Sequence, residues 1–172
     1  EGGTVIVQEP LSGKILAMAN FPNFDPNNYS DFDIKSFLNP AMQLVYEPGS
    51  VFKIMTMAAG IDSGKITPET TYVDKGTVTL NNKTIHNWWD KIYGKATMTE
   101  VLENSINTGS VFAEQKTGHE IFYQYLMKFG FNELTRINLP GEVKSNIRNL
   151  VKGLDIHYAN ASFVKGISVT PI

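Results

Sequence analysis

Apolar residues cluster in short runs along the chain, and the first two runs predict a β-hairpin. They occupy residues 4–7 and 14–19, with a Pro-Leu-Ser-Gly segment between them at 10–13. Pro, Ser and Gly favour a turn, and Gly supplies a positive φ. Because both arms are almost continuously apolar, we expect both faces of the hairpin to be covered. The next segment, residues 21–31, is rich in Pro, Asn and Asp and predicts an irregular loop.

The apolar run over residues 51–61 predicts a helix. A Glu-Pro-Gly-Ser turn at 47–50 precedes it, and Gly64 follows it as a stop signal. At 3.6 residues per turn, its apolar positions cover nearly the whole circumference of the helix. A helix that is apolar on all sides is typical of a buried helix. We therefore expect this helix to be buried, with Lys53 inside the buried segment.

Four further elements follow from local signals. A second hairpin is expected around the Asn-Asn pair at 81–82, with arms at 77–80 and 83–85. The Thr-Met-Thr-Glu segment at 97–100 has the spacing of a capping box and predicts a helix to about Asn107. Helices are also expected at 111–116 and 120–129, with Gly130 as the residue after the second.

The pair Ser50 and Lys53 is the strongest chemical signal. Residues three apart lie on one helix face, so the hydroxyl and the amine can meet. Burial lowers a lysine pKa, and a neutral amine can take the serine proton to create a nucleophile. Backbone N–H groups at the start of the helix favour the negative charge that develops on an attacked carbonyl. The alternative is a lysine that reaches solvent and a serine that only caps the helix.

Ser105 and Asn107 form a second element, Ser-Ile-Asn. This S-x-N spacing accompanies S-x-x-K in serine enzymes that react with penicillin. Ser105 would relay a proton between Lys53 and the leaving group, and Asn107 would bind the substrate backbone. By itself the segment would be an ordinary polar helix end.

With these motifs the sequence resembles the transpeptidase domain of a class B penicillin-binding protein. Tyr-Glu-Pro-Gly-Ser-Val-Phe-Lys at 46–53 is similar to the nucleophile signature of that family. Family-like segments occur in family order along essentially the whole chain; they are Gly-Gly-Thr-Val-Ile-Val (2–7), Phe-Pro-Asn-Phe-Asp-Pro-Asn (21–27), Asn-Pro-Ala (39–41), Phe-Gly-Phe (129–131), Leu-Pro-Gly-Glu (139–142) and Gly-Ile-Ser-Val-Thr-Pro (166–171). Two positions depart from the family: Pro40 replaces an Arg, and Val164-Lys165-Gly166 replaces Gly-Gln-Gly.

The resemblance implies an α/β (α+β) fold, like that of penicillin-binding proteins and β-lactamases, with an antiparallel sheet packed against helices. It implies that residues 1–172 are part of one such domain, the opening hairpin and the helical half, without the C-terminal strands. We therefore expect this chain alone to be a poor enzyme, and its exposed strand edge to promote self-association.

The resemblance also implies a function. Ser50 would attack the carbonyl of a peptidoglycan stem peptide ending in D-Ala-D-Ala, form an acyl-enzyme and be trapped by β-lactam antibiotics. Lys53 and Ser105 would be catalytic, and Asn107 would bind substrate; neither a cofactor nor a metal ion is implied. The expected location is the extracytoplasmic face of the bacterial cytoplasmic membrane, through an N-terminal anchor outside this chain. Proteins of cell division or elongation (cell shape) would be its partners.

Lys116-Thr117-Gly118 spells the third motif of the family, K-T-G, close after Asn107. It follows a stretch with helical character, and Lys and Gly are typical of a helix C-terminus. We interpret it as a helix end and expect the functional K-T-G beyond Ile172. For Trp88-Trp89 with Tyr93 we favour a small satellite core over an aromatic wall beside a groove.

Composition excludes several other classes. The 172 residues are 42% hydrophobic with a net charge of -2, which indicates a globular chain and argues against binding to nucleic acid. The sequence has no Cys, so thiol catalysis is excluded. Its three histidines show no metal-ligand spacing. A serine β-lactamase and a β-lactam sensor without catalytic activity remain as alternatives to the transpeptidase.

Overall fold

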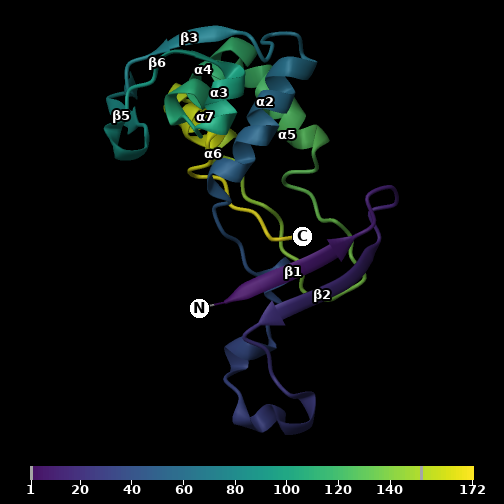
Figure 1. Cartoon of the computed structure of the whole chain (residues 1–172). Coiled ribbons are helices and arrows are strands. Elements are labelled where there is room, and N and C mark those ends of the chain that lie inside the picture. The colour runs from purple at the N-terminus through teal and green to yellow at the C-terminus, as the bar shows by residue number, and fades with distance from the viewer. Residues whose placement is uncertain (1, 152) are drawn as a thin grey trace. The chain divides into compact units, whose positions relative to one another are not determined.

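The computed structural model describes residues 2–151 and 153–172, and the chain forms two compact units (Figure 1). The hairpin unit comprises Glu1–Tyr46, Glu133–Ser145 and Ser168–Ile172. The helical unit comprises Glu47–Asn132 and Asn146–Ile167. Within the described ranges, no helix is both long and apolar enough to cross a bilayer.

The hairpin unit begins with the predicted β-hairpin. β1 (Gly3–Gln8) pairs antiparallel with β2 (Ile15–Phe21), and Gly13 adopts a positive φ of 72° in the connection. The expectation that both faces are covered is wrong, because Val5 and Leu16 are largely exposed. The short helix α1 (Pro40–Gln43) packs against both strands. The apolar run therefore predicted the strands correctly but not the number of faces that are covered.

The loop after β2 is more regular than its composition suggests. It contains two 3-10 turns, η1 (Pro26–Asp31) and η2 (Ile34–Phe37). Asp25 caps η1 by accepting a hydrogen bond from the Asn27 N–H, so the polar breakers of this segment act as caps.

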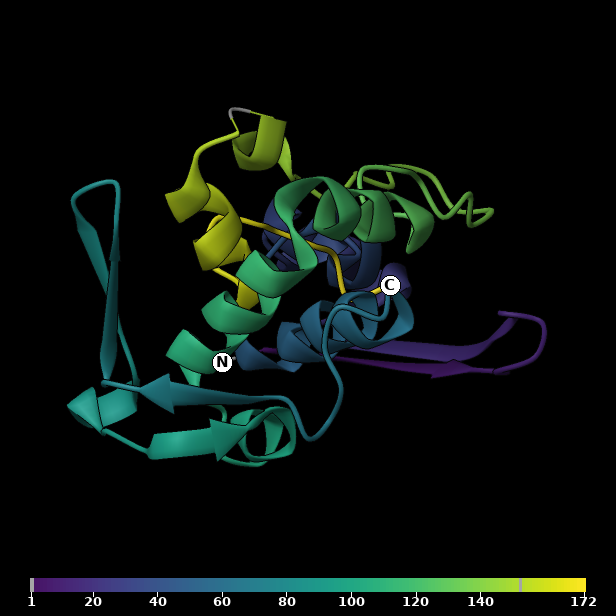
Figure 2. The same cartoon turned by 90° about the horizontal axis from the view of Figure 1, so that it is seen from above.

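The helical unit is built around α4. Figure 2 shows α4 between α2 and α7, and both helices pack against it. The elements of the unit, in chain order, are η3 (Gly49–Phe52), α2 (Lys53–Asp62), β3 (Thr71–Asp74), β4 (Thr77–Leu80), β5 (Lys83–His86), η4 (Trp88–Asp90), β6 (Gly94–Thr97), α3 (Met98–Glu103), α4 (Asn107–Thr117), α5 (His119–Lys128), α6 (Arg148–Val151) and α7 (Asp155–Ser162).

The helix predicted from the apolar run at 51–61 is present, as the 3-10 turn η3 followed by α2. Its burial on all sides is contradicted, since Val51 and Ile54 are 67% and 61% exposed. The buried stripe runs instead through Lys53, Thr56 and Gly60. A Cβ atom at Gly60 would lie 2.6 Å from Ile66 Cδ1 and 2.9 Å from Thr117 Oγ1. Close packing of the helix therefore depends on small and polar residues, which a count of apolar positions overlooks.

Local signals predicted most helix ends. Thr97 and Glu100 form the expected capping box at the start of α3. The end of α5 has Gly130 at φ 85°, with N–H groups of residues 130 and 131 bonded to the carbonyls of Met127 and Leu126. The predicted end of the earlier helix near Asn107 is wrong, because α3 stops at Glu103.

The sheets are two-stranded in the part of the chain that is described. β4 and β5 form the predicted hairpin, with Asn81 and Asn82 both at positive φ, as a tight two-residue turn requires. The pairing of β3 with β6 was not predicted, because these short strands lie far apart in sequence. Helices α6 and α7 were also missed. α7 is buried but only weakly amphipathic, so it leaves no clear period in the sequence.

Glu114 provides a stability test inside α4. Its side chain is buried, and its carboxylate oxygens have no hydrogen-bond partner among the described residues. Nearby lie the Nε2 atom of His119, 3.7 Å from Oε1, and the side chains of Asp155 and Tyr158. Burial, with a smaller contribution from the negative charge of Asp155, raises the pKa of Glu114 to about 8.

We expect Glu114→Gln to stabilise the protein increasingly as pH rises. The folded state keeps the Glu114 proton up to about pH 8, whereas the unfolded chain releases it near 4.5. The wild type therefore loses stability relative to Gln between these values, on the order of 3 kcal/mol by pH 7. Thermal unfolding of both proteins across this range measures the difference. A stability difference that does not change with pH would contradict the raised pKa of Glu114.

Candidate active site

Lys53 is the centre of the predicted site and is only 1% exposed. Its Nζ donates to the backbone oxygen of Ser105 at 2.5 Å, to Ser105 Oγ at 2.9 Å and to Asn107 Oδ1 at 2.9 Å. These three acceptors match the three donors of an ammonium group. The structure therefore brings three of the four predicted site residues into direct contact.

Burial also changes the acidity of this amine. Desolvation lowers the pKa of Lys53 from its ordinary value to about 8. At neutral pH a useful minority of the molecules then carries a neutral amine, which can accept a proton. A pKa in this range is what a general base that works near neutral pH requires.

Ser50 stands one turn before Lys53 and is exposed. It belongs to the 3-10 turn η3, in which residues three apart eclipse each other, and the Lys53 N–H donates to the Ser50 carbonyl. Gly49, at φ 67°, makes the bend into this turn. Ser50, Ser105 and Asn107 line one open pocket of about 430 Å³. All four predicted site residues therefore meet at this pocket or directly beneath it.

Ser105 has an unusual backbone. It lies in the connection between α3 and α4 with φ 53°, a left-handed conformation that is costly for residues with a Cβ atom. The N–H groups of Ser105 and Ile106 bond to the carbonyls of Leu102 and Val101, the pattern of a helix end that usually has Gly at this position. A serine is thus present where glycine would give the more stable backbone.

We expect Ser105→Gly to raise stability and slow acylation together. Glycine removes the strain of the left-handed conformation, roughly 1 kcal/mol, but also removes the hydroxyl that contacts Lys53. Loss of a proton relay should slow acylation about tenfold, less than the ~10²–10⁴-fold of a base that acts directly, because water can partly replace the relay. Thermal unfolding and the rate of penicillin labelling measure the two effects. Ser105→Ala, which keeps the strain, should slow labelling without stabilisation; normal labelling of both variants would contradict the relay.

Asn107 connects the site to the last residue of β5. Its Oδ1 accepts from Lys53, and its Nδ2 donates to the His86 carbonyl at 2.9 Å. One N–H of the amide is then still available to bind a substrate carbonyl.

The Lys-Thr-Gly segment at 116–118 is the end of α4, as the helix-end interpretation predicted. Gly118 has φ 87°, and Thr117 Oγ1 donates to the Ala113 carbonyl within the helix. Lys116 Nζ lies 5.6 Å from the ring centroid of Phe112. The segment forms no strand and does not line the pocket of Ser50.

Trp88 and Trp89 were wrongly assigned to a satellite core. They are 75% and 88% exposed, and with Tyr93 they line the same pocket as Ser50. The alternative interpretation, an aromatic wall beside a groove, is the one that matches the structure. Two adjacent tryptophans were the available signal in the sequence, but their hydrophobicity favoured burial.

Residues 164–166, where the sequence differs from the family pattern, have an unusual backbone conformation. Val164, at a position where the family commonly has Gly, adopts φ 57° although its side chain is branched and buried. Gly166 has φ 79°, and its N–H donates to Glu47 Oε1 at 2.7 Å, next to the turn that carries Ser50. The backbone keeps a glycine-like bend despite the valine.

Comparison with known proteins gives consistent results. The chain is 34% identical over 181 residues to a Peptidoglycan D,D-transpeptidase FtsI homolog of Mesostigma viride, covering 99% of this chain and 30% of that protein. It is 33% identical over 174 residues to Stage V sporulation protein D of Bacillus subtilis, covering 100% of this chain and 27% of that protein. The chain thus spans less than a third of the length of these relatives.

A solved structure has the same fold. The TP domain of Burkholderia pseudomallei penicillin-binding protein 3 superposes with a TM-score of 0.82 at 23% identity, over 98% of this chain and 46% of that one. The predicted fold class is therefore confirmed. The family model "Penicillin binding protein transpeptidase domain" matches residues 3–172. This chain belongs to the family of penicillin-binding protein transpeptidase domains.

Proposed function

We propose that this chain provides the nucleophile and the general base of a peptidoglycan D,D-transpeptidase. The observation that carries the proposal is the buried Lys53, whose amine contacts Ser105 and Asn107 at the floor of the pocket that Ser50 lines. The match to the transpeptidase family model and the names of the relatives support the same activity.

The proposed chemistry uses Ser50 as the nucleophile and Lys53 as the base. Neutral Lys53 takes the Ser50 proton as Oγ forms a bond to the carbonyl carbon of a peptide ending in D-Ala-D-Ala. The C–N bond to the terminal D-Ala then breaks, and Ser105 passes a proton from Lys53 to the leaving nitrogen. The amine of a second stem peptide then attacks the acyl carbon, the ester bond to Ser50 Oγ breaks, and the amine proton returns through Lys53 to Oγ, which completes the cross-link. If water replaces that amine, the same acyl-enzyme gives carboxypeptidase activity.

A β-lactam would follow the first half of the same path. Its strained amide is opened by Ser50, but the nitrogen stays attached to the acyl group and cannot leave the pocket. We extend the proposal to the extracytoplasmic face of the cell envelope as the location, and to cell-division or elongation proteins as partners. The poor activity expected of these 172 residues alone stays a prediction.

One experiment separates this function from its alternatives. The full-length protein that contains these residues is incubated with benzylpenicillin, and separately with a donor peptide ending in D-Ala-D-Ala plus an amine acceptor. We expect one stable penicilloyl group per molecule, and D-Ala release with formation of the cross-linked product. Steady penicillin hydrolysis would favour a β-lactamase, and stable acylation without peptide turnover would favour a sensor; either result would contradict the proposal.

The rate of acylation should depend on pH through Lys53. Only the neutral amine can accept the Ser50 proton, and its pKa is about 8. We expect the second-order rate constant with benzylpenicillin to rise about tenfold per pH unit below this value and to level off above it. Labelling reactions that are quenched at set times, between about pH 6 and 9, measure this rate constant at each pH. A profile that is flat across this range would exclude Lys53 as the base.

A further inference from the structure

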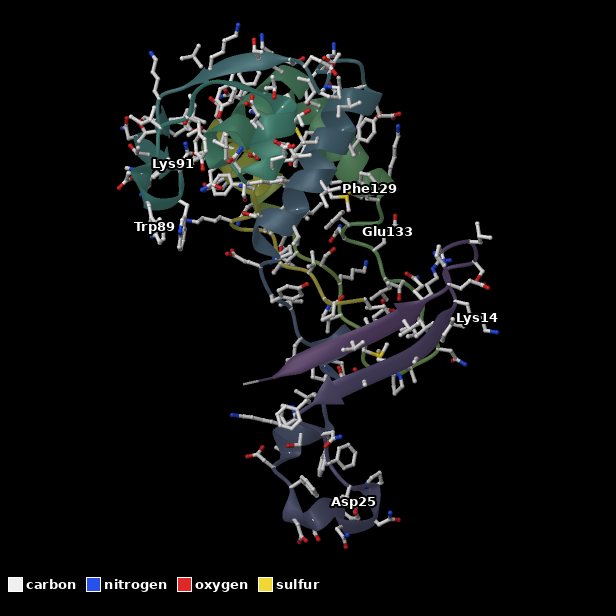
Figure 3. All side chains as sticks on the ribbon, in the orientation of Figure 1. Lys14, Asp25, Trp89, Lys91, Phe129 and Glu133 are labelled. Carbon is white, nitrogen blue, oxygen red and sulfur yellow. The ribbon has the colours of Figure 1, made fainter. Side chains whose placement is uncertain are left out.

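The segment between β5 and β6 displays two tryptophans beside the candidate nucleophile. Figure 3 labels Trp89 and Lys91 on this segment of the helical unit. The two indole rings, of Trp88 and Trp89, have centroids 6.1 Å apart and planes inclined by 32°. Neighbouring exposed aromatic side chains are a common mark of a binding site. We name Trp88, Trp89 and Tyr93 the aromatic wall.

The backbone beneath the aromatic wall is strained and firmly held. Trp89 and the next residue, Asp90, both have φ 54°, a conformation that costs free energy for residues with a Cβ atom. The buried Asn87 bonds to the Lys91 carbonyl and to Asp74, and Asp74 also accepts the Tyr93 N–H. Two buried polar side chains thus fix both ends of the segment. This hydrogen-bond network therefore holds the two tryptophans in their exposed positions.

The charge of the pocket comes from one side chain. Among the described residues that line it, Lys91 alone is charged. Its Nζ lies 4.3 Å from the ring centroid of Tyr93, so a cation–π contact holds the ammonium group against the wall. Lys53 lies below the pocket and is engaged with its own three acceptors. Lys91 is therefore the exposed cation that a ligand on Ser50 would meet.

We propose that Lys91 and the aromatic wall form a subsite for a carboxylate carried by the side chain of the acyl donor. The wall contacts the apolar part of that side chain, and the ammonium group pairs with its carboxylate. The inference rests on the proposed acylation of Ser50 and adds a preference among donors. It selects negatively charged acyl side chains over neutral and positively charged ones.

Three penicillins test this preference because they differ at one carbon of the side chain. Benzylpenicillin has hydrogen there, carbenicillin a carboxylate and ampicillin an amine. Second-order acylation rates of the full-length protein are measured with each, for the wild type, Lys91→Gln and Lys91→Glu. Lys95→Gln, an exposed lysine on β6, is the matched control for the same change of charge.

We expect Lys91→Gln to slow carbenicillin roughly threefold to fivefold more than it slows benzylpenicillin, the upper range for an exposed ion pair. Lys91→Glu should slow carbenicillin about tenfold and accelerate ampicillin, because the charge is reversed. Lys95→Gln should leave all three rates unchanged. Equal effects of the Lys91 variants on the three penicillins would overturn the subsite while leaving the acylation intact. If no penicillin acylates the wild type, the proposed function itself fails.

Discussion

Lys53→Met is expected to reduce β-lactam acylation by roughly 10²–10⁴-fold, the usual effect of losing a general base. Methionine is close to lysine in length and volume, so it can fill the same buried space. It has no basic nitrogen, and Ser50 would lose the group that takes its proton. Labelling of the full-length protein with a fluorescent penicillin measures the effect, and circular dichroism shows whether the fold is kept.

Two controls make the Lys53 result specific. Lys116→Ala changes the lysine of the Lys-Thr-Gly segment, which lies at the end of α4 outside the pocket, and should label at the wild-type rate. Lys53→Arg keeps a positive charge that cannot be titrated and should be as slow as Lys53→Met. Near-normal labelling of Lys53→Met would remove this residue from the mechanism. A large loss in Lys116→Ala would show that the third motif was misinterpreted.

Substitution of Asp74 should give the largest loss of stability, because its buried carboxylate accepts hydrogen bonds from several segments. The donors are the N–H groups of Gly76 and Tyr93, the Asn87 amide and the Thr108 hydroxyl. Burial acts to raise the pKa of Asp74, but these hydrogen bonds outweigh it and keep the pKa below its ordinary value.

We expect Asp74→Asn to lower the free energy of unfolding by about 3 kcal/mol. The NH₂ group of the new Asn would face N–H and O–H donors, which need an acceptor. The sign of the pH effect follows from the lowered pKa: the wild type keeps the stabilisation above the unfolded pKa and loses it as pH falls through the folded pKa. Urea unfolding of both proteins measures the loss near neutral pH and in acid. The exposed Glu69→Gln is the control and should change little; an equal, small effect of both substitutions would contradict this role of Asp74.

The sequence located the candidate site better than it predicted the packing. Ser50, Lys53, Ser105 and Asn107 were found from spacing and context, because reacting groups must recur at fixed intervals on a helix or a turn. The burial of Lys53 was also predicted, although the reason given for it, a helix apolar on all sides, was wrong. Hydrophobicity alone does not show which face of α2 packs, since Thr56 and Gly60 lie on the buried side.

The elements missed by sequence reasoning depend on distant partners. β3 pairs with β6 across more than one intervening element, and nothing local to either strand indicates this pairing. The end of α3 was placed too late because its left-handed residue is Ser105, where sequence signals expect glycine. The aromatic wall was assigned to a core because its exposure follows from Asp74 and Asn87, whose burial only the fold shows.

Locating the penicilloyl group is the most direct test of the account. The full-length protein is incubated with benzylpenicillin and digested, and tandem mass spectrometry identifies the modified residue. We predict a single adduct on the peptide that contains Ser50, its site at the Ser50 side chain, and no adduct in Ser50→Ala. An adduct on any other residue of the wild type, or undiminished labelling of Ser50→Ala, would contradict the assignment of Ser50 as the nucleophile.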